Sequence, residues 1–259
     1  MILAAGLGTR LRPLTDTRPK ALVEIAGRTL LEITLTRLRA FGITEVIINV
    51  HHFADLVIDY LKSNKNFGMR IEISREEVLL DTGGGLKKAA WFFLEDPTHL
   101  DEPFLLHNVD VLSTIDFARM LQFHKENHAL ATLAVQARET SRPLLFDNHL
   151  QLRGRGVALN QDPELVSNNP AGAPRQGTAS APEVPLQSLA FSGIHMISPR
   201  LLPMLTEEGI FSIIPAYLRL AAQGQPILAF RADTYYWRDL GRPSDLTQAA
   251  HDFQRNALL

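Results

Sequence analysis

Glycines and cationic side chains gather near the start of the chain, at spacings that suit a bound polyphosphate. Gly6 and Gly8 follow directly on the short apolar segment 2–4, and a run of cations comes after them: Arg10, Arg12, Arg18 and Lys20. Glycine lets backbone N–H groups approach phosphate without interference from a Cβ atom, and guanidinium and ammonium groups supply charge-assisted hydrogen bonds. We therefore predict that residues 4–20 bind a polyphosphate; the alternative is a tight turn with solvated arginines.

Two better-known glycine loops do not fit this segment. The P-loop requires Gly-x-x-x-x-Gly-Lys followed by Ser or Thr, and the chain lacks that order of residues. The dinucleotide-binding fingerprint requires a third glycine where this chain has Leu11. The segment is therefore a candidate phosphate loop of another kind.

A second glycine-rich segment lies at residues 80–89. We expect its three successive glycines, Gly83, Gly84 and Gly85, to lie where a helix begins, and we place that helix at residues 84–93. Backbone without side chains can lie flat against a base or ribose, and the helix dipole favours a nearby anion. Taken alone, the segment could be only a flexible helix entry.

Two aspartates stand at the predicted carboxyl ends of strands. Asp110 closes segment 105–110, and Asp239 closes the strand predicted at 235–239. Ligands of open α/β sheets bind at this edge, and Mg²⁺ takes one or two carboxylates together with phosphate oxygens. We predict that both carboxylates ligate Mg²⁺ beside residues 4–20, although each alone could be a turn residue or a helix cap.

The elements that must position these residues alternate between strand and helix. Apolar and β-branched runs predict strands at 2–4, 45–50, 70–73, 104–107 and 130–137. Apolar residues at three- and four-residue spacings predict helices at 29–41, 54–63, 84–93 and 116–127. Because strand–helix–strand units make right-handed crossovers, we predict an α/β fold with a doubly wound, mostly parallel mixed sheet and helices on both faces.

Residues 138–190 interrupt this alternation. Segments 144–146 and 150–152 predict a small hairpin, and the composition of residues 154–189, rich in Gly, Pro, Asn, Ser and Ala, predicts an extended, mobile excursion. Regular elements then return, with strands at 190–197, 226–230 and 235–239 and helices at 213–223 and 243–255. A chain of 259 residues is compatible with a single α/β domain.

Composition excludes several classes of function. The chain is 46% hydrophobic and 21% charged, with a formal net charge of −2, so it lacks the basic excess expected of a binder of nucleic acid or membrane surfaces. It contains no cysteine, which excludes disulfides, thiolate metal sites and a cysteine nucleophile. No signal-peptide core and no apolar run of ~18 residues is found, so we expect a cytoplasmic protein.

With Arg10, Pro13, Pro19 and Lys20 at these spacings, the first segment closely resembles the signature of the sugar-1-phosphate nucleotidyltransferases. The resemblance extends from residue 2 to residue 245 and is strongest to short members without a carboxyl-terminal β-helix, which implies a Rossmann-like, GT-A-like fold. The glycine segment at 82–85 is most similar to that of N-acetylmuramate-1-phosphate uridylyltransferase, and mannose-1-phosphate guanylyltransferases are also similar. A single domain over 1–259 is implied, with a nucleotide-binding half at about 1–137 and a sugar-binding half at about 138–259.

The resemblance implies a role for each matching residue. Residues that would line the nucleotide are small or lack a side chain: Ala4, Ala5, Gly6, Gly8, Thr9 and Gly84. Arg10 would hold the leaving portion of the triphosphate, and Lys20 would bridge the α-phosphate and the attacking sugar phosphate. Asp110 and Asp239 would ligate Mg²⁺, and Ser192 and Gly193 would contact the sugar.

The implied reaction is in-line attack by an oxygen of a sugar 1-phosphate on the α-phosphorus of a nucleoside triphosphate, which releases pyrophosphate. No general base is required because the nucleophile is already an anion near neutral pH, and catalysis would consist of positioning and charge neutralisation. The glycine segment favours UTP as donor. One rival is GTP with mannose or heptose 1-phosphate, and another is a non-catalytic sensor of nucleotide sugars. We expect a monomer or small homo-oligomer that serves nucleotide-sugar synthesis for the cell envelope.

Two positions depart from the family pattern. Val109 stands where the family commonly has glycine before its aspartate, so the turn must accept a β-branched residue. No lysine follows Lys125, although longer members place a mid-chain lysine on the sugar phosphate. Arg153 or Arg155 could substitute for that lysine, or the contact could be missing.

Histidines near the predicted sheet edge receive structural interpretations. Adjacent strand residues point to opposite faces, so His51 and His52 are not expected to share a metal ion, and we interpret them as a turn or surface feature. His107 closes a buried strand, where a histidine is more often a packed residue than a catalyst.

Overall fold

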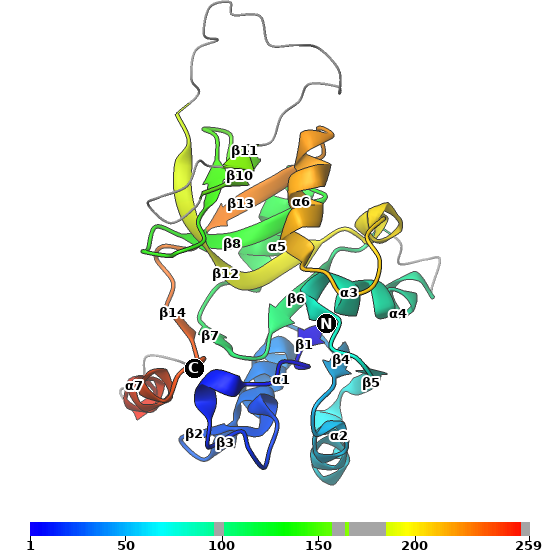
Figure 1. Ribbon diagram of the computed structural model, residues 1–259, viewed down its shortest axis with the longest axis vertical. Coiled ribbons are helices and arrows are strands. Elements are labelled where there is room, and N and C mark those ends of the chain that lie inside the picture. Colours follow the sequence, from blue (N-terminus) through cyan, green and yellow to red (C-terminus); the bar gives the residue numbers. More distant parts are fainter. Residues whose placement is uncertain (96–100, 157–163, 166–184, 255–259) are drawn as a thin grey trace, which may run out of the picture.

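The computed structural model describes residues 1–95, 101–156, 164–165 and 185–254. A ten-stranded mixed sheet runs through these residues (Figure 1), and its strands are β1 (Ile2–Leu3), β4 (Glu45–Val50), β5 (Arg70–Arg75), β6 (Phe104–Asn108), β8 (Ala131–Gln136), β9 (Leu144–Phe146), β10 (Leu152–Arg155), β11 (Glu164–Leu165), β12 (Gln187–Ile197) and β13 (Ile227–Arg231). The strand order is β11-β10-β9-β12-β6-β1-β4-β5, with β8 beside β12 and β13 beside β8.

Parallel pairing dominates the core of this sheet. β1 lies parallel to both β4 and β6, β4 lies parallel to β5, and β13 lies parallel to β8. The long strand β12 runs antiparallel to β6, β8 and β9 and so joins the two halves of the chain. The predicted doubly wound mixed sheet is confirmed, and the described residues contain no β-helix.

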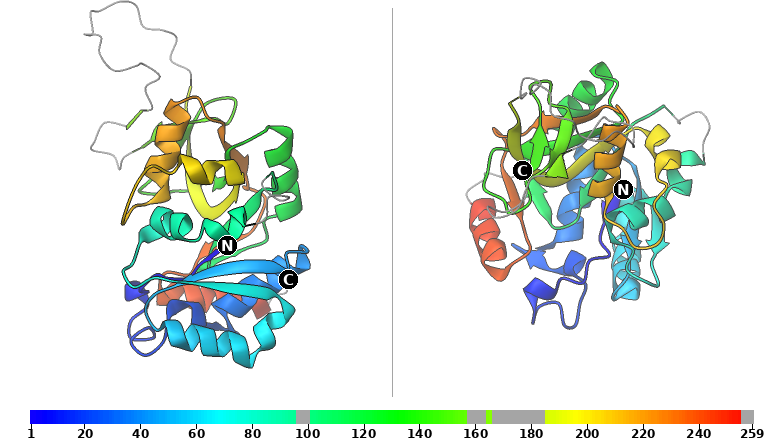
Figure 2. Two further views of the ribbon diagram at one scale, coloured as in Figure 1. Left: turned by 90° about the vertical axis from the view of Figure 1, so that its right-hand side faces the viewer. Right: turned by 45° about the horizontal axis from the view of Figure 1, so that its top comes forward.

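Helices cover both faces of the sheet. They are α1 (Leu30–Ala40), α2 (Ala54–Ser63), α3 (Asp81–Lys88), α4 (Trp91–Leu94), α5 (Phe117–Glu126), α6 (Ile213–Ala222) and α7 (Pro243–Gln254). Figure 2 (left) shows α2 on one side of β4 and β5, and α3 and α4 on the other. Successive residues of β4 therefore join different cores: Ile48 packs in one hydrophobic cluster, and Ile47 packs in the other with Leu86 of α3. Among the described residues, no helix is long and apolar enough to cross a membrane.

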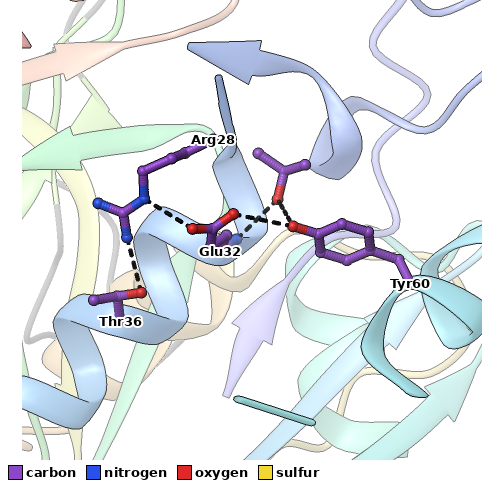
Figure 3. A network of polar contacts seen from close by, with 5 residues as sticks. Arg28, Glu32, Thr36 and Tyr60 are labelled. Carbon is purple, nitrogen blue, oxygen red and sulfur yellow. Dashed lines mark hydrogen bonds and ion pairs between the residues drawn. The ribbon is translucent and has the colours of Figure 1, made fainter. Parts of the chain in front are cut away.

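A network of polar contacts holds α1 against α2 (Figure 3). Thr29 caps α1, since its hydroxyl accepts a hydrogen bond from Glu32 N at 3.0 Å. The Glu32 carboxylate accepts from Arg28 Nε at 2.9 Å and from the Tyr60 hydroxyl at 3.1 Å. Arg28 also donates to the Thr36 hydroxyl at 2.9 Å. Because Tyr60 belongs to α2, this network stabilises the helical layer on one face of β1 and β4.

A two-stranded ribbon completes the edge of the sheet where β6 ends. β7 (Val111–Ser113) pairs antiparallel with β14 (Trp237–Asp239), and Asp239 lies opposite Val111. The next residue, Leu240, donates its backbone N–H to the carbonyl of Asp110 at 2.8 Å. The ribbon therefore brings a strand from near the carboxyl end of the chain to the end of β6.

Most predicted elements lie within three residues of their expected ends, but two predictions are wrong. The helix predicted at 84–93 is two helices: α3 begins at Asp81, so the three glycines lie inside it, and α4 follows as a separate short helix. The excursion predicted at 154–189 is too wide, because β10 continues to Arg155 and β12 begins at Gln187. Most of the remaining excursion, residues 157–163 and 166–184, lies outside the described residues.

Candidate active site

A cavity of about 460 Å³ opens at the carboxyl ends of β1, β4 and β6. Five of the predicted site residues line it: Ala4, Ala5, Gly6, Lys20 and Asp110. The three small residues leave the space open, and Lys20 and Asp110 provide charge at one part of the wall. The structure thus places the first loop at the sheet edge where the sequence predicts a ligand.

Gly8 and Thr9 lie farther along the same loop and are not among the residues that line this cavity. Gly8 adopts a φ of 65°, and a Cβ atom at this position would come within 2.9 Å of the Thr15 side chain and 3.1 Å of Lys20. Only glycine therefore fits where the loop turns over Lys20. The Thr15 hydroxyl donates to the Gly8 carbonyl at 2.9 Å and stabilises the turn.

Beneath the loop lies a buried pair, Asn49 and Glu76, that sequence analysis missed. Asn49 Oδ1 accepts the backbone N–H of Ala4 at 2.7 Å, and Asn49 Nδ2 donates to Glu76 Oε1 at 2.7 Å. The second oxygen of Glu76 accepts the backbone N–H of Leu80 at 2.9 Å. The pair therefore connects the first loop to the segment before α3. The signals for this pair in the sequence are an amide, Asn49, within an apolar strand and a carboxylate, Glu76, directly after the next strand.

Replacing Glu76 with Gln is expected to lower the free energy of unfolding by about 1–3 kcal/mol, because both Glu76 oxygens accept hydrogen bonds in a site only 2% exposed. The new amide nitrogen would face either Asn49 Nδ2 or Leu80 N, and both are donors. Urea denaturation followed by circular dichroism measures the loss. The exposed neighbour Glu77→Gln is the matched control, and equal stabilities of the two variants would contradict the role given to the pair.

Lys20 and Asp110 form a salt bridge at the cavity. Lys20 begins the short 3₁₀ turn η2 (Lys20–Leu22), directly after Pro19, and is only 7% exposed. Its Nζ donates to Oδ2 of Asp110, which follows β6. The Asp110 carboxylate compensates the burial of the Lys20 ammonium group, which lies at the wall of the cavity. The structure thus brings together two residues predicted separately, one for phosphate and one for metal.

Asp239 lies beside this salt bridge through the pairing of β7 and β14. Burial raises the pKa of its carboxyl group, the negative charge of Asp110 raises it further, and the charges of Lys20 and Arg10 oppose the rise. The guanidinium of Arg10 lies 3.9 Å from Asp239 Oδ1 and remains largely exposed. Two carboxylates and two cations that are distant in sequence therefore share one electrostatic environment.

The donor set at this place fits a divalent metal ion such as Mg²⁺. Asp110 and Asp239 offer carboxylate oxygens, which hard cations prefer, and their mutual repulsion is what a bound cation would relieve. Gly241 keeps space open, because a Cβ atom there would collide with Asp239 Oδ1 and lie 2.6 Å from Arg10 Nη2. Within the described part of the chain no three acidic, histidine or cysteine side chains form a metal-binding group, so water or substrate oxygens would complete the coordination.

The glycines of α3 lie within a helix and pack against other parts of the chain. Gly83, Gly84 and Gly85 are buried inside the helix and are not among the residues that line the cavity. A Cβ atom on Gly85 would lie 2.8 Å from both Asn49 Nδ2 and Glu76 Oε1. Glycine is needed here so that α3 can approach the buried pair, while the preceding residues of α3, Asp81 and Thr82, reach the cavity. The nucleotide role assigned to Gly84 stays a prediction.

Ser192 and Gly193 lie on β12, next to the ribbon. Ser192 is fully buried, and its carbonyl accepts a hydrogen bond from Trp237 Nε1 at 2.8 Å. Gly193 has a φ of 72° and packs closely on Asn108, where β12 shifts its register with β8. The guanidinium of Arg138 stacks 3.7 Å from the Trp237 ring centroid and donates to the Phe191 carbonyl at 2.7 Å. A cation and an aromatic ring therefore lie beside this bulge.

The guanidinium group of Arg153 is paired with a carboxylate. Its Nη2 lies 2.7 Å from Oδ2 of Asp147, a buried carboxylate. Burial raises the pKa of Asp147, but hydrogen bonds from Gln151 N and Arg153 outweigh that effect, and the net pKa is lowered. This side chain therefore stabilises the hairpin of β9 and β10.

The structure agrees with the interpretations given to the histidines. His107 is 1% exposed, its Nδ1 lies 2.8 Å from the carbonyl of Asn108, and burial is the main cause that lowers its pKa to about 4. It is therefore a neutral, packed residue near pH 7. His51 Nδ1 contacts the carbonyl of Glu76 at 2.8 Å, whereas the His52 ring packs on Phe53. The two side chains have different partners and do not form a metal-binding pair.

Fold and site together define an α/β protein with a cavity at the carboxyl edge of its sheet, where acidic and cationic side chains gather. Residues 1–146 match the family model described as nucleotidyl transferase. The chain is also 32% identical over 249 residues to N-acetylmuramate alpha-1-phosphate uridylyltransferase of Caulobacter vibrioides, a match that covers 94% of this chain and 91% of that protein. The chain therefore belongs to the nucleotidyl transferase family, whose members generally use a divalent metal ion, and the predicted resemblance is confirmed.

A further relative and two solved structures are also similar to the chain. Mannose-1-phosphate guanyltransferase of Yarrowia lipolytica is 28% identical, and the match covers 95% of this chain but 61% of that protein. Among solved structures, HddC from Yersinia pseudotuberculosis complexed with GMP-PN has a TM-score of 0.71 at 21% identity, with 97% of both chains covered. UDP-glucose pyrophosphorylase complexed with UDP-glucose has a TM-score of 0.74 at 17% identity, covering 98% of this chain and 97% of that one. These two structures share the fold.

Proposed function

We propose that the chain joins a sugar 1-phosphate to a nucleoside triphosphate and releases pyrophosphate. The observation that carries this proposal is the salt bridge of Lys20 and Asp110 at the cavity lined by residues 4–6, with Asp239 close enough for its carboxyl group to feel both charges. The buried ammonium group of Lys20 suits the negative charge of two phosphates, and the carboxylates of Asp110 and Asp239 suit one divalent cation. Membership in the nucleotidyl transferase family supports the same reaction class.

In this reaction an oxygen of the sugar 1-phosphate forms a bond to the α-phosphorus, and the bond from that phosphorus to the pyrophosphate oxygen breaks. The nucleophile is already an anion, so no side chain has to remove a proton. Lys20 neutralises charge between the α-phosphate and the sugar phosphate, and Arg10 holds the leaving phosphates. Mg²⁺ held by Asp110 and Asp239 would supply charge stabilisation at the phosphoryl oxygens.

The sugar 1-phosphate is proposed to lie toward the carboxyl-terminal half, at the bulge of β12. Ser192 and Gly193 border this region, and Trp237 is on the same face of β14 as Asp239 because the two residues are two positions apart in a strand. Arg138, stacked on Trp237, is the cation we assign to the sugar phosphate in place of a mid-chain lysine. In our proposal this half binds the acceptor, and residues 1–137 bind the donor.

We propose that UTP is the donor and that the nucleotide-sugar product is used in the cell envelope. We place the reaction in the cytoplasm, where nucleoside triphosphates are available. The support is the 32% identity to a uridylyltransferase over nearly the whole of both chains. A second candidate is GTP with mannose or heptose 1-phosphate, which the 28% identity to a guanyltransferase favours.

A screen of pyrophosphate release separates these candidates. Each reaction contains the purified chain, Mg²⁺, one of the four nucleoside triphosphates and one sugar 1-phosphate. The sugar is N-acetylmuramate, glucose, mannose or heptose. We expect the fastest release with UTP. Fastest release with GTP and mannose or heptose 1-phosphate would establish the second candidate instead. If no pair of substrates releases pyrophosphate faster than it does with an Asp239→Asn preparation, both candidates are contradicted.

A further inference from the structure

Residues 209–211, which precede α6 in the carboxyl-terminal half, are attached to the beginning of α3. Three backbone hydrogen bonds of Phe211 make the attachment, and a fourth bond comes from the first residue of α6. Gly83 N and Gly84 N donate to Phe211 O at 2.9 and 3.2 Å, Phe211 N donates to Leu80 O at 3.1 Å, and Ile213 N donates to Thr82 Oγ1 at 3.0 Å. Three of the four hydrogen bonds join a backbone donor to a backbone acceptor, so the position of the segment depends little on flexible side chains. We call residues 209–211 the α3 strap.

The glycines of α3 make this close approach possible. A Cβ atom on Gly83 would collide with the ring of Phe211, and one on Gly84 would lie 2.6 Å from the carbonyl oxygen of Gly209. Such distances are far below van der Waals contact, so any larger residue would displace the strap. The glycine run, which looks like a ligand-binding loop in the sequence, is thus the surface on which the strap lies.

The middle residue of the strap, Ile210, is placed at the cavity. It lines the same cavity as Ala4, Ala5 and Gly6, and it is 64% exposed. This is the largest exposed fraction among the large hydrophobic side chains that the structure describes. The backbone hydrogen bonds of its neighbour Phe211 fix the chain at this point, and ligand cavities are lined mainly by apolar side chains.

We propose that Ile210 is a donor-binding residue, against which the base of the donor nucleotide packs. The inference rests on the proposed function, since it assumes that a nucleotide occupies this cavity. The cations Lys20 and Arg10 attract the phosphates, so the uncharged base takes the apolar part of the wall. The donor site is then completed by a residue of the carboxyl-terminal half, and α3 is the element that positions it.

Direct binding of ligands tests this assignment without turnover. Calorimetry compares UMP, GMP and pyrophosphate with the wild type, with Ile210→Ala, and with Leu56→Ala as the control. Leu56 is also an exposed apolar residue, at 43%, but it lies on α2 and away from the cavity. We expect Ile210→Ala to weaken the better-bound nucleotide roughly tenfold and to leave pyrophosphate binding and the thermal unfolding midpoint unchanged. Leu56→Ala should bind all three ligands as the wild type does.

The possible outcomes separate this inference from the proposed function. Wild-type nucleotide affinity in Ile210→Ala would overturn the inference and leave the proposed function intact. Equal losses of nucleotide and pyrophosphate affinity would also overturn it, because a contact to the base does not act on pyrophosphate. If the wild type binds neither nucleotide and releases no pyrophosphate in the screen, the proposed function fails, and the inference fails with it.

Discussion

Replacing Asp239 with Asn is expected to lower the rate of pyrophosphate release at least about a hundredfold while the chain remains folded. The substitution keeps the size of the side chain but removes the negative charge that faces Asp110, Lys20 and the proposed cation. The backbone pairing of β14 with β7 does not involve the carboxylate, so the ribbon should persist. The measurement is the rate as a function of Mg²⁺ concentration, with circular dichroism to monitor folding.

The same loss is expected for Asp110→Asn, although this change also removes the salt-bridge partner of buried Lys20. The matched control is Asp55→Asn, an exposed aspartate on α2 whose partner is Arg75. It should retain the wild-type rate and the wild-type Mg²⁺ dependence. Wild-type rates in both the Asp110 and the Asp239 variants would show that the metal assignment is incorrect.

Replacing Lys20 with Met is expected to reduce turnover by about two orders of magnitude, because the apolar side chain keeps the packing under Gly8 but lacks the charge that neutralises the phosphates. The pH profile should change as well. Lys20 lowers the pKa of Asp239, so its removal lets that pKa rise. Asp239 binds a cation only when deprotonated; therefore the fall in rate on acidification should begin at a higher pH than in the wild type.

Rates measured from acidic to neutral pH at one fixed, subsaturating Mg²⁺ concentration test both parts of this prediction. Lys62→Met, on the exposed side of α2, is the control and should leave the rate and the profile unchanged. A lower rate with an unshifted profile would mean that Lys20 acts on the phosphates but does not couple to Asp239. A wild-type rate would remove Lys20 from the proposed mechanism.

The strands and helices around the site could be predicted because their apolar patterns are local. The segments at 45–50 and 54–63 carry a β-branched run and an amphipathic helical spacing, and β4 and α2 have these same bounds. The strand-end positions of Asp110 and of residues 4–6 follow from the same alternation. Parallel strands present their carboxyl ends at one edge, so the meeting of these residues at the cavity was a consequence of the fold class.

Contacts between distant segments could not be predicted in this way. Glycine has a low helix propensity, so a run of three favours a loop, but Gly83 and Gly84 face the α3 strap and Gly85 faces the Asn49–Glu76 pair. These tertiary contacts outweigh the local preference. Ile210 was missed for a related reason: nothing in a loop sequence tells which helix it will contact.

The ribbon of β7 and β14 has a consequence for how the protein acquires activity during synthesis. The part of the chain that matches the family model, residues 1–146, contains Lys20 and Asp110 but neither Ile210 nor Asp239. A nascent chain on the ribosome can therefore contain β1, β4, β5 and β6 and still lack Asp239, the second of the two carboxylates that we propose as metal ligands. Ligands stabilise only the state that binds them. Substrate and cation would therefore favour the state in which β14, the last strand, has paired with β7.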